Sequence, residues 1–308
     1  MPHVLIVGAE SARYMQLLQA ENLPHITFSI FPDVQLAKHA YGLIEIILGP
    51  PDAVVPLLPL CDKLGWVQSS WAGVKPLVRA ARRDYQLTGV KDVFGPRMSE
   101  FVMGWLLALE RNIVQRAGRS QWDNTVDSGL TGKTLGIMGT GSIGTVVAET
   151  ALVFGLQIRG MNSTGEPSAP FQQCYAIQGR IQFAQGLDYL VALLPDTPAT
   201  DGIVNQQLLA ALKPGAIFIN GGRANCVDDG ALVSALDNGQ LRAAVLDVVH
   251  TEPLPDDDSL WQVDNLYISS HTAAPTPESS VVALFAENYR RYIDGKPLLH
   301  LINFDRGY

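Results

Sequence analysis

Four side chains in the second half of the chain are of the types that transfer protons and bind small acids. They are the cation Arg223, the carboxylates Asp247 and Glu252, and the imidazole of His271. Because histidine changes its charge near neutral pH, His271 is suited to protonate an oxygen on which negative charge develops. The planar guanidinium of Arg223 can hold a carboxylate in a bidentate pair. These residue types fit the reduction of a keto acid by a hydride donor, provided that the fold brings them together.

Each of these side chains stands at or after the end of a predicted strand. Arg223 comes soon after one apolar stretch, Asp247 lies near the end of another, and His271 directly follows a third. Parallel strands of an open α/β sheet end at the same edge, and ligands bind there. We therefore expect these groups around one crevice. Considered singly, a histidine after a strand is more often a core or capping residue, and Arg223 is equally consistent with a surface charge.

A glycine-rich turn supplies a place for the hydride donor. An apolar segment leads into Gly139, Gly141, Ser142, Ile143 and Gly144, and apolar residues then recur at helical spacing. This pattern predicts a strand, a tight turn and a helix, in which the second glycine allows backbone to approach a pyrophosphate. The N–H groups at the helix start would bind the anion. The alternative is a glycine-rich turn with a purely structural role.

Strand and helix patterns alternate along the whole chain, which predicts an α/β fold with doubly wound parallel sheets. The strands are expected at 4–7, 26–31, 43–48, 66–69, 134–138, 157–161, 188–194, 216–220, 243–248 and 267–270. Helices are expected at 54–60, 99–116, 142–154, 205–212 and 229–238, and from residue 278 onward. The helix at 99–116 is apolar on so much of its surface that it must lie in a domain or subunit interface.

Composition limits the class of protein. The 308 residues are 47% hydrophobic and carry a net charge of −8, without a basic patch for nucleic acid. The three cysteines are widely spaced, so neither a disulfide framework nor a metal site is expected. No membrane span and no leader segment is indicated, and a cytoplasmic location is expected.

Several ordered motifs resemble those of the D-isomer-specific 2-hydroxyacid dehydrogenase family, most densely from residue 132 to 276. They are Gly139-Thr-Gly-Ser-Ile-Gly144, Pro195-Asp-Thr-Pro-Ala-Thr200, Ile219-Asn-Gly-Gly-Arg223, Asp247-Val-Val-His-Thr-Glu252-Pro-Leu-Pro255 and Ser270-His271-Thr-Ala-Ala. The resemblance implies that Arg223 orients the substrate and that Glu252 tunes His271. It further implies that His271 protonates the carbonyl oxygen.

The resemblance also implies where the two ligands bind. Asp247 would hold the nicotinamide carboxamide. The coenzyme would also contact the loop that contains Leu194, Pro195 and Thr200. The substrate carboxylate would bind backbone amides of the loop Ala72, Gly73 and Val74.

The domain order follows from the same resemblance. A flavodoxin-like substrate domain would consist of residues 1–95 and 278–308, and a dinucleotide-binding domain, residues 96–277, would be inserted into it. Both would be Rossmann-like. The helix at 99–116 resembles the dimer-forming element of the family, so a homodimer is expected.

One position departs from the usual NAD-binding pattern. Where the second strand of such a unit would carry an acidic residue for the ribose, the chain has Asn162, followed by Ser163 and Thr164. Losing the carboxylate removes a repulsion against a 2′-phosphate, and all three side chains can donate hydrogen bonds. The sequence therefore favours NADP over NAD, although no arginine or lysine follows directly.

The expected activity is an NAD(P)-dependent reductase of the glyoxylate or hydroxypyruvate type, acting on a small 2-keto/2-hydroxy acid of D configuration. Two alternatives stay open: a dehydrogenase for a bulkier 2-hydroxy acid, and a non-catalytic NAD(P)-sensing regulator of the same fold. Replacing His271 separates an enzyme from a regulator.

Overall fold

The structure, a computed structural model, describes residues 1–31, 41–117, 120–122 and 124–305. The domain ranges expected from the sequence include residues 32–40, 118–119, 123 and 306–308, which lie outside the described residues. The chain divides into two compact units. Unit one comprises Met1–Val93 and Thr276–Tyr308, and unit two comprises Phe94–Pro275.

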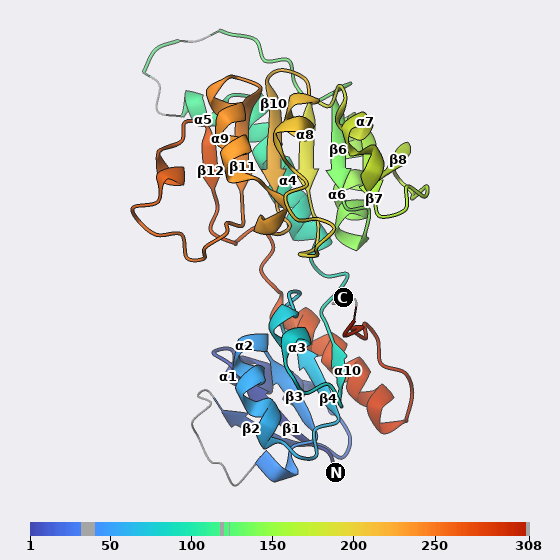
Figure 1. The fold of residues 1–308 in the computed structure, drawn as a ribbon. Coiled ribbons are helices and arrows are strands. Elements are labelled where there is room, and N and C mark those ends of the chain that lie inside the picture. The colour runs from blue at the N-terminus through green and yellow to red at the C-terminus, as the bar shows by residue number, and fades with distance from the viewer. Residues whose placement is uncertain (32–40, 118–119, 123, 306–308) are drawn as a thin grey trace. The chain divides into compact units, whose positions relative to one another are not determined.

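Unit one contains a parallel sheet in the flavodoxin-like order β2-β1-β3-β4-β5, counted over its described residues (Figure 1). Its strands are β1 His3–Val7, β2 Thr27–Phe31, β3 Ile46–Gly49, β4 Trp66–Ser69 and β5 Gln86–Thr88. Its helices are α1 Ser11–Ala20, α2 Pro51–Val54, α3 Lys75–Arg79 and α10 Glu278–Ile293, with 3₁₀ segments η1 Tyr41–Leu43 and η2 Val55–Leu60. The last helix packs on this sheet, since Trp66 stacks on Phe285 with ring centroids 5.0 Å apart.

Unit two contains a second parallel sheet, whose order within the described part of the chain is β12-β11-β10-β9-β6-β7-β8. Its strands are β6 Thr134–Met138, β7 Gln157–Asn162, β8 Gln173–Ala176, β9 Tyr189–Ala192, β10 Ala216–Asn220, β11 Leu241–Leu246 and β12 Leu266–Ile268. Its helices are α4 Gly95–Glu110, α5 Ile113–Arg116, α6 Ser142–Val153, α7 Arg180–Ala184, α8 Gln206–Ala210 and α9 Asp229–Asp237, with η3 Ile177–Gly179, η4 Ala224–Cys226 and η5 Ser259–Gln262. Counted from β6, this is the Rossmann order, so the predicted fold class is confirmed.

The central strands of unit two are largely apolar because helices cover both faces of the sheet (Figure 1). Every residue of β6, β9 and β10 is buried. On one face, Val102 of α4 and Val147 of α6 join a common core, and on the other Leu208 of α8 and Leu232 of α9 do so. The sheet is thus a rigid base for the loops at its edge.

Two predicted helices differ from the observed ones. The helix expected at 99–116 begins earlier and divides into α4 and α5 because Asn112 adopts a left-handed conformation with φ of 50°. The helix expected at 54–60 is largely the 3₁₀ segment η2, which contains Pro56 and Pro59. Proline lacks the N–H that a regular α-helical turn requires. Within the described ranges, no helix is both long and apolar enough to cross a membrane.

A buried carboxylate anchors the end of α4. Glu110, whose side chain is 3% exposed, accepts hydrogen bonds from Ser128 Oγ at 2.6 Å, Tyr189 OH at 2.9 Å and Arg242 Nη2 at 2.7 Å, and another from Lys133 Nζ. Burial by itself raises the pKa of the Glu110 carboxyl, but these hydrogen bonds and the charge of Arg242 outweigh it and lower the pKa to about 2. The ionised carboxylate therefore joins the end of α4 to the first residues of β9 and β11.

We expect Glu110→Gln to destabilise the protein at neutral pH by about 2 kcal/mol, because hydrogen bonds to a charged group are lost. The folded pKa of about 2 lies below the ordinary value of 4.5, so the unfolded chain binds more protons between these pH values. The contribution of Glu110 is therefore complete above pH 4.5 and disappears as the pH falls toward 2. Urea unfolding across this pH range should show that the difference in unfolding free energy between wild type and variant becomes smaller in acid.

The matched control is Glu100→Gln, since Glu100 is an exposed residue of the same helix. Its unfolding free energy should stay close to that of the wild type throughout. A gap for Glu110→Gln that stays constant from neutral pH to acid would contradict the assigned role of the ionised carboxylate.

Candidate active site

The glycine turn after β6 has the geometry that a dinucleotide needs. Gly139 adopts a φ of 108°, and a Cβ there would lie 2.8 Å from Leu193 O. A Cβ on Gly144 would collide with the Gly139 carbonyl, so this glycine lets α6 pack against the turn. At Gly141, in contrast, a Cβ would meet nothing within 4 Å. The open side of the turn is therefore at Gly141, where backbone can approach a ligand.

The start of α6 offers hydrogen-bond donors at this open side. Gly141 is the N-cap residue of α6, and Ser142 and Ile143 form its first turn. The first N–H groups of a helix have no partner within the helix, and the helix dipole favours an anion there. Gly141, Ser142 and Ile143 thus form a cradle that fits a pyrophosphate.

The loop after β9 lies beside this turn. Leu193 N donates to Met138 O at 2.9 Å, which places the following Leu194 and Pro195 near the glycines. Thr200 Oγ1 donates to Pro195 O at 2.7 Å and accepts from Thr197 N at 3.1 Å. The buried Thr200 hydroxyl therefore fixes the shape of the loop.

At the end of β7, Asn162 is part of a closed set of hydrogen bonds. Its Nδ2 donates to Thr140 Oγ1 and to Glu166 O, at 3.1 and 3.0 Å. Ser163 and Thr164, which follow it, are exposed. Thr164 Oγ1 donates to Asn162 Oδ1 at 3.4 Å, so the hydroxyl donor left to face solvent in this span is that of Ser163.

The turn after β10 carries Arg223 and is held by a residue to which we assigned no role from the sequence. The fully buried Asn220 accepts from Gly222 N at 3.1 Å and donates to Arg223 O at 3.2 Å. A Cβ on Gly222 would lie 2.7 Å from Leu194 N, so the turn packs closely against the loop after β9. The asparagine inside the Ile219-Asn-Gly-Gly-Arg223 motif was the available sequence signal.

The buried carboxylate of Asp247 organises the segment that contains the histidine. Its Oδ1 accepts from Ser269 Oγ, Thr272 N and Ala273 N at 2.8, 2.8 and 3.0 Å, and its backbone oxygen accepts from His271 N at 2.6 Å. Asp247 N in turn donates to the backbone oxygen of Asn220, the residue that holds the arginine turn. The Arg223 and His271 segments are thereby joined through adjacent strand ends.

His271 and Glu252 form a direct pair. His271 Nδ1 lies 2.8 Å from Glu252 Oε2, and Glu252 Oε1 accepts from Val249 N at 3.2 Å. Ser270 and His271 both have positive φ values, 55° and 58°, which L-residues adopt only where their surroundings hold them. With Nδ1 directed at the carboxylate, Nε2 is the ring nitrogen that can hold or give a proton to a ligand.

Two further titratable side chains near these segments, His250 and Cys226, have other roles. His250 Nε2 lies 3.2 Å from Val227 O and 3.8 Å from Asp229 Oδ1, so this histidine has partners of its own. Burial raises the pKa of the Cys226 thiol to about 12, which makes it a packing residue rather than a nucleophile.

The loop predicted to bind the substrate carboxylate belongs to unit one. Ala72, Gly73 and Val74 lie between β4 and α3. The preceding Ser69 fixes this loop, because its Oγ accepts from Trp71 N at 3.1 Å and donates to Trp71 O at 2.8 Å. The loop thus stands at the carboxyl end of a strand, as expected.

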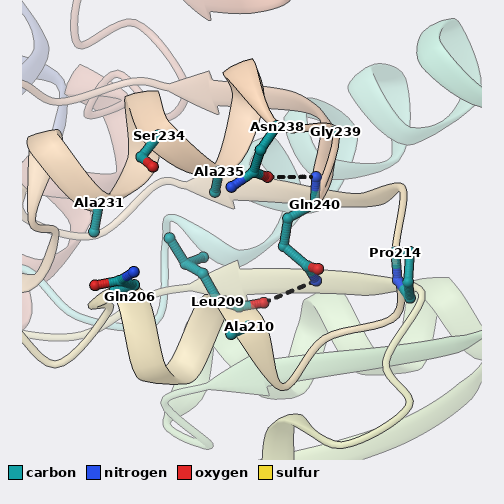
Figure 2. Close-up of a pocket in the computed structure, with 10 residues that line it drawn as sticks. All are labelled: Gln206, Leu209, Ala210, Pro214, Ala231, Ser234, Ala235, Asn238, Gly239 and Gln240. Atoms are coloured by element: carbon teal, nitrogen blue, oxygen red, sulfur yellow. Dashed lines mark hydrogen bonds between the residues drawn. The ribbon is translucent and has the colours of Figure 1, made fainter.

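Two cavities lie elsewhere in unit two. One of about 360 Å³ lies between α8 and α9 and is lined by Leu209 and by Gln240, which donates from Nε2 to Leu209 O (Figure 2). Another, of about 260 Å³, lies beside Glu110. Both cavities are lined by Pro214, which precedes β10. Arg223 and Asp247, in contrast, follow β10 and β11. The cavities are therefore at the opposite end of the sheet from the candidate site.

Comparison with known proteins identifies the family. The sequence profile described as "D-isomer specific 2-hydroxyacid dehydrogenase, NAD binding domain" matches residues 103–273 of the 308. The chain is 37% identical over 176 residues to glyoxylate/hydroxypyruvate reductase A of Klebsiella pneumoniae, a match that covers 57% of this chain and 56% of that enzyme.

Solved structures match over nearly the whole chain. A D-isomer specific 2-hydroxyacid dehydrogenase family protein from Aeromonas salmonicida is 39% identical, with a TM-score of 0.93 and coverage of 99% of each chain. An NADPH-dependent glyoxylate/hydroxypyruvate reductase from Sinorhizobium meliloti, solved with NADP and sulfate, is 26% identical, with a TM-score of 0.90 and full coverage of both chains. The chain therefore belongs to the D-isomer-specific 2-hydroxyacid dehydrogenases, a family of NAD(P)-dependent oxidoreductases.

Proposed function

We propose that the protein reduces a small 2-keto acid, of the glyoxylate or hydroxypyruvate type, to the D-2-hydroxy acid. The observation that carries this proposal is the pair formed by His271 Nδ1 and Glu252 Oε2 at 2.8 Å, at the same edge of the sheet as a glycine turn that fits a dinucleotide. The Klebsiella and Sinorhizobium relatives, which are named as reductases of these two acids, support the substrate class.

The roles of the side chains follow from their chemistry. A reduced nicotinamide, when bound, supplies the hydride. His271 Nε2 gives a proton to the carbonyl oxygen as negative charge develops on it, and Glu252 holds the imidazole in position. Arg223 orients the substrate through its carboxylate and carbonyl oxygens. Asp247 would hold the nicotinamide carboxamide.

We expect His271→Ala to lower turnover with glyoxylate and hydroxypyruvate by at least about a hundredfold, because a general acid is removed. The Kd for the coenzyme should change little. The consumption of reduced nicotinamide, followed by absorbance, measures the first quantity, and quenching of protein fluorescence measures the second.

His250→Gln serves as the matched control, since His250 lies in the same segment but has separate partners. It should keep wild-type turnover. If His271→Ala turned over at the wild-type rate, the catalytic role of this histidine would be refuted. A wild type that bound coenzyme but reduced no 2-keto acid would instead favour a regulator.

We further propose that NADP is preferred over NAD. The span 162–164 carries no carboxylate that would repel a 2′-phosphate, and the exposed hydroxyl of Ser163 can donate to it. NADP in the Sinorhizobium complex and NADPH in that of a relative from Xanthobacter autotrophicus are consistent with this preference.

The wild type should show a kcat/KM with NADPH about tenfold above that with NADH, the effect of hydrogen bonds to a charged group. Ser163→Asp should reverse the order, because a carboxylate repels the 2′-phosphate and can accept from a ribose hydroxyl. The matched variant Ser163→Asn adds no charge and should not reverse it. A wild type that uses NADH more efficiently would refute the preference.

A homodimer is also proposed, from exposed apolar side chains of unit two. Ile113 and Val114 of α5 are 55% and 41% exposed, Trp122 and Val126 are 95% and 92% exposed, and Val153 at the end of α6 is 84% exposed. Isolated exposed apolar residues are ordinary, and it is the number and high exposure of those in unit two that favour a contact with another chain. A second copy of the chain would bury them.

Light scattering after size-exclusion chromatography should give twice the mass of the chain. Trp122→Glu together with Val153→Glu should shift the protein toward the monomer, because each places a charge in an apolar contact. Replacing the exposed Leu43 of unit one by Glu is the control and should leave the mass unchanged. A monomeric wild type would refute the proposal.

A cytoplasmic location is proposed as well. All three cysteines lie within the described residues and are free thiols. Free thiols persist in reducing compartments, which suits a cytoplasmic enzyme.

A further inference from the structure

The residue at the end of β7 has no hydrogen-bonding capacity left for a ligand. Asn162 Nδ2 carries two N–H groups, and they donate to Thr140 Oγ1 at 3.1 Å and to Glu166 O at 3.0 Å. Its Oδ1 accepts from Thr164 N at 3.2 Å and from Gly165 N at 2.6 Å. An asparagine side chain offers two donors and one acceptor oxygen with two lone pairs, so every position is used. A phosphate could bind the Asn162 amide only by breaking one of these contacts.

The same hydrogen bonds join two segments that a bound dinucleotide would contact at the same time. Thr140 belongs to the glycine turn, whereas Glu166 and Gly165 belong to the loop after β7. Asn162 lies between them and bonds to both. It therefore fixes the distance between the segment that cradles the pyrophosphate and the segment next to the adenosine ribose.

Packing independently holds the turn against β7. A Cβ on Gly160 would lie 2.5 Å from Thr140 Cγ2, so the threonine methyl lies directly on the strand. Gly139 N also donates to Met161 O at 2.8 Å. The backbone, the methyl and the hydroxyl of the turn thus contact three successive residues of β7, and Asn162 supplies the polar contact.

We propose that Asn162 is a positioning residue for the coenzyme, which clamps the loop after β7 to the glycine turn and does not itself bind the 2′-phosphate. This inference rests on the proposed function and replaces the donor role that the sequence suggested for Asn162. Within the described residues, Ser163 Oγ has no hydrogen-bond partner, so Ser163 is the side chain available to the phosphate. The clamp serves NADH and NADPH alike, since both contain the pyrophosphate and the ribose.

A double-mutant cycle on binding tests the clamp. The variants are Asn162→Ala, Thr140→Val and their combination, with the Kd of NADPH and of NADH measured separately by fluorescence quenching. Each single variant should raise the Kd of NADPH and the Kd of NADH by a similar factor of about tenfold, because hydrogen bonds within the site are lost. The combined variant should be only slightly weaker than Asn162→Ala, because both changes remove the same contact. In turnover, the KM for coenzyme should rise while kcat stays near the wild-type value.

Ser163→Ala is the matched comparison, because it should raise the Kd of NADPH and leave the Kd of NADH unchanged. If Asn162→Ala lost affinity for NADPH but not for NADH, the inference would be overturned, since this would show that Asn162 binds the phosphate directly. Additive losses in the combined variant, or no loss in either single variant, would overturn it too.

Thr140→Val keeps the shape of the side chain and its methyl contact, so it tests the clamp even if Asn162→Ala fails to fold. Circular dichroism melting of each variant separates a binding loss from unfolding. Wild-type protein that bound neither coenzyme would overturn the proposed function together with this inference. Normal wild-type binding with any of the contrary patterns above would overturn the inference alone.

Discussion

The site depends on one buried carboxylate, that of Asp247. Two successive residues, Ser270 and His271, adopt left-handed conformations, each of which costs about 1–3 kcal/mol. Three donors converge on Asp247 Oδ1, and hydrogen bonds to a charged group contribute about 1.5–3 kcal/mol each. The hydrogen bonds therefore suffice to hold the strained turn. His271 can pair with Glu252 because the turn presents it in this conformation.

The parallel sheet of unit two places the ligand-binding loops at one edge and the stabilising carboxylate Glu110 at the other. The glycine turn, the loop after β9, the arginine turn and the histidine turn all follow strands, so they meet at one edge of the sheet. Asn220, at the end of β10, bonds to both the arginine turn and Asp247, and makes these loops one unit. At the opposite edge, Glu110 holds the end of α4. Changes at Glu110 therefore affect folding, whereas those at the carboxyl edge affect ligands.

The coenzyme end shows how an amide differs from the acidic residue common in NAD sites. A carboxylate only accepts hydrogen bonds and is therefore free to bind ribose hydroxyls. Asn162 both donates and accepts, and it bonds to protein on both sides. These contacts explain how a strand end without a carboxylate can remain ordered.

The sequence by itself determined the α/β class and the family, because apolar strands, glycine spacing and motif order are local properties. It also singled out Arg223, Glu252 and His271, whose motifs are continuous. Tertiary structure alone decided the partners of Asn162 and Asp247, which lie 22 and 25 residues away at Thr140 and Thr272. It likewise decided the break after α4 at Asn112. Such contacts depend on how strands pair and loops close, and no local pattern encodes which donor reaches which acceptor.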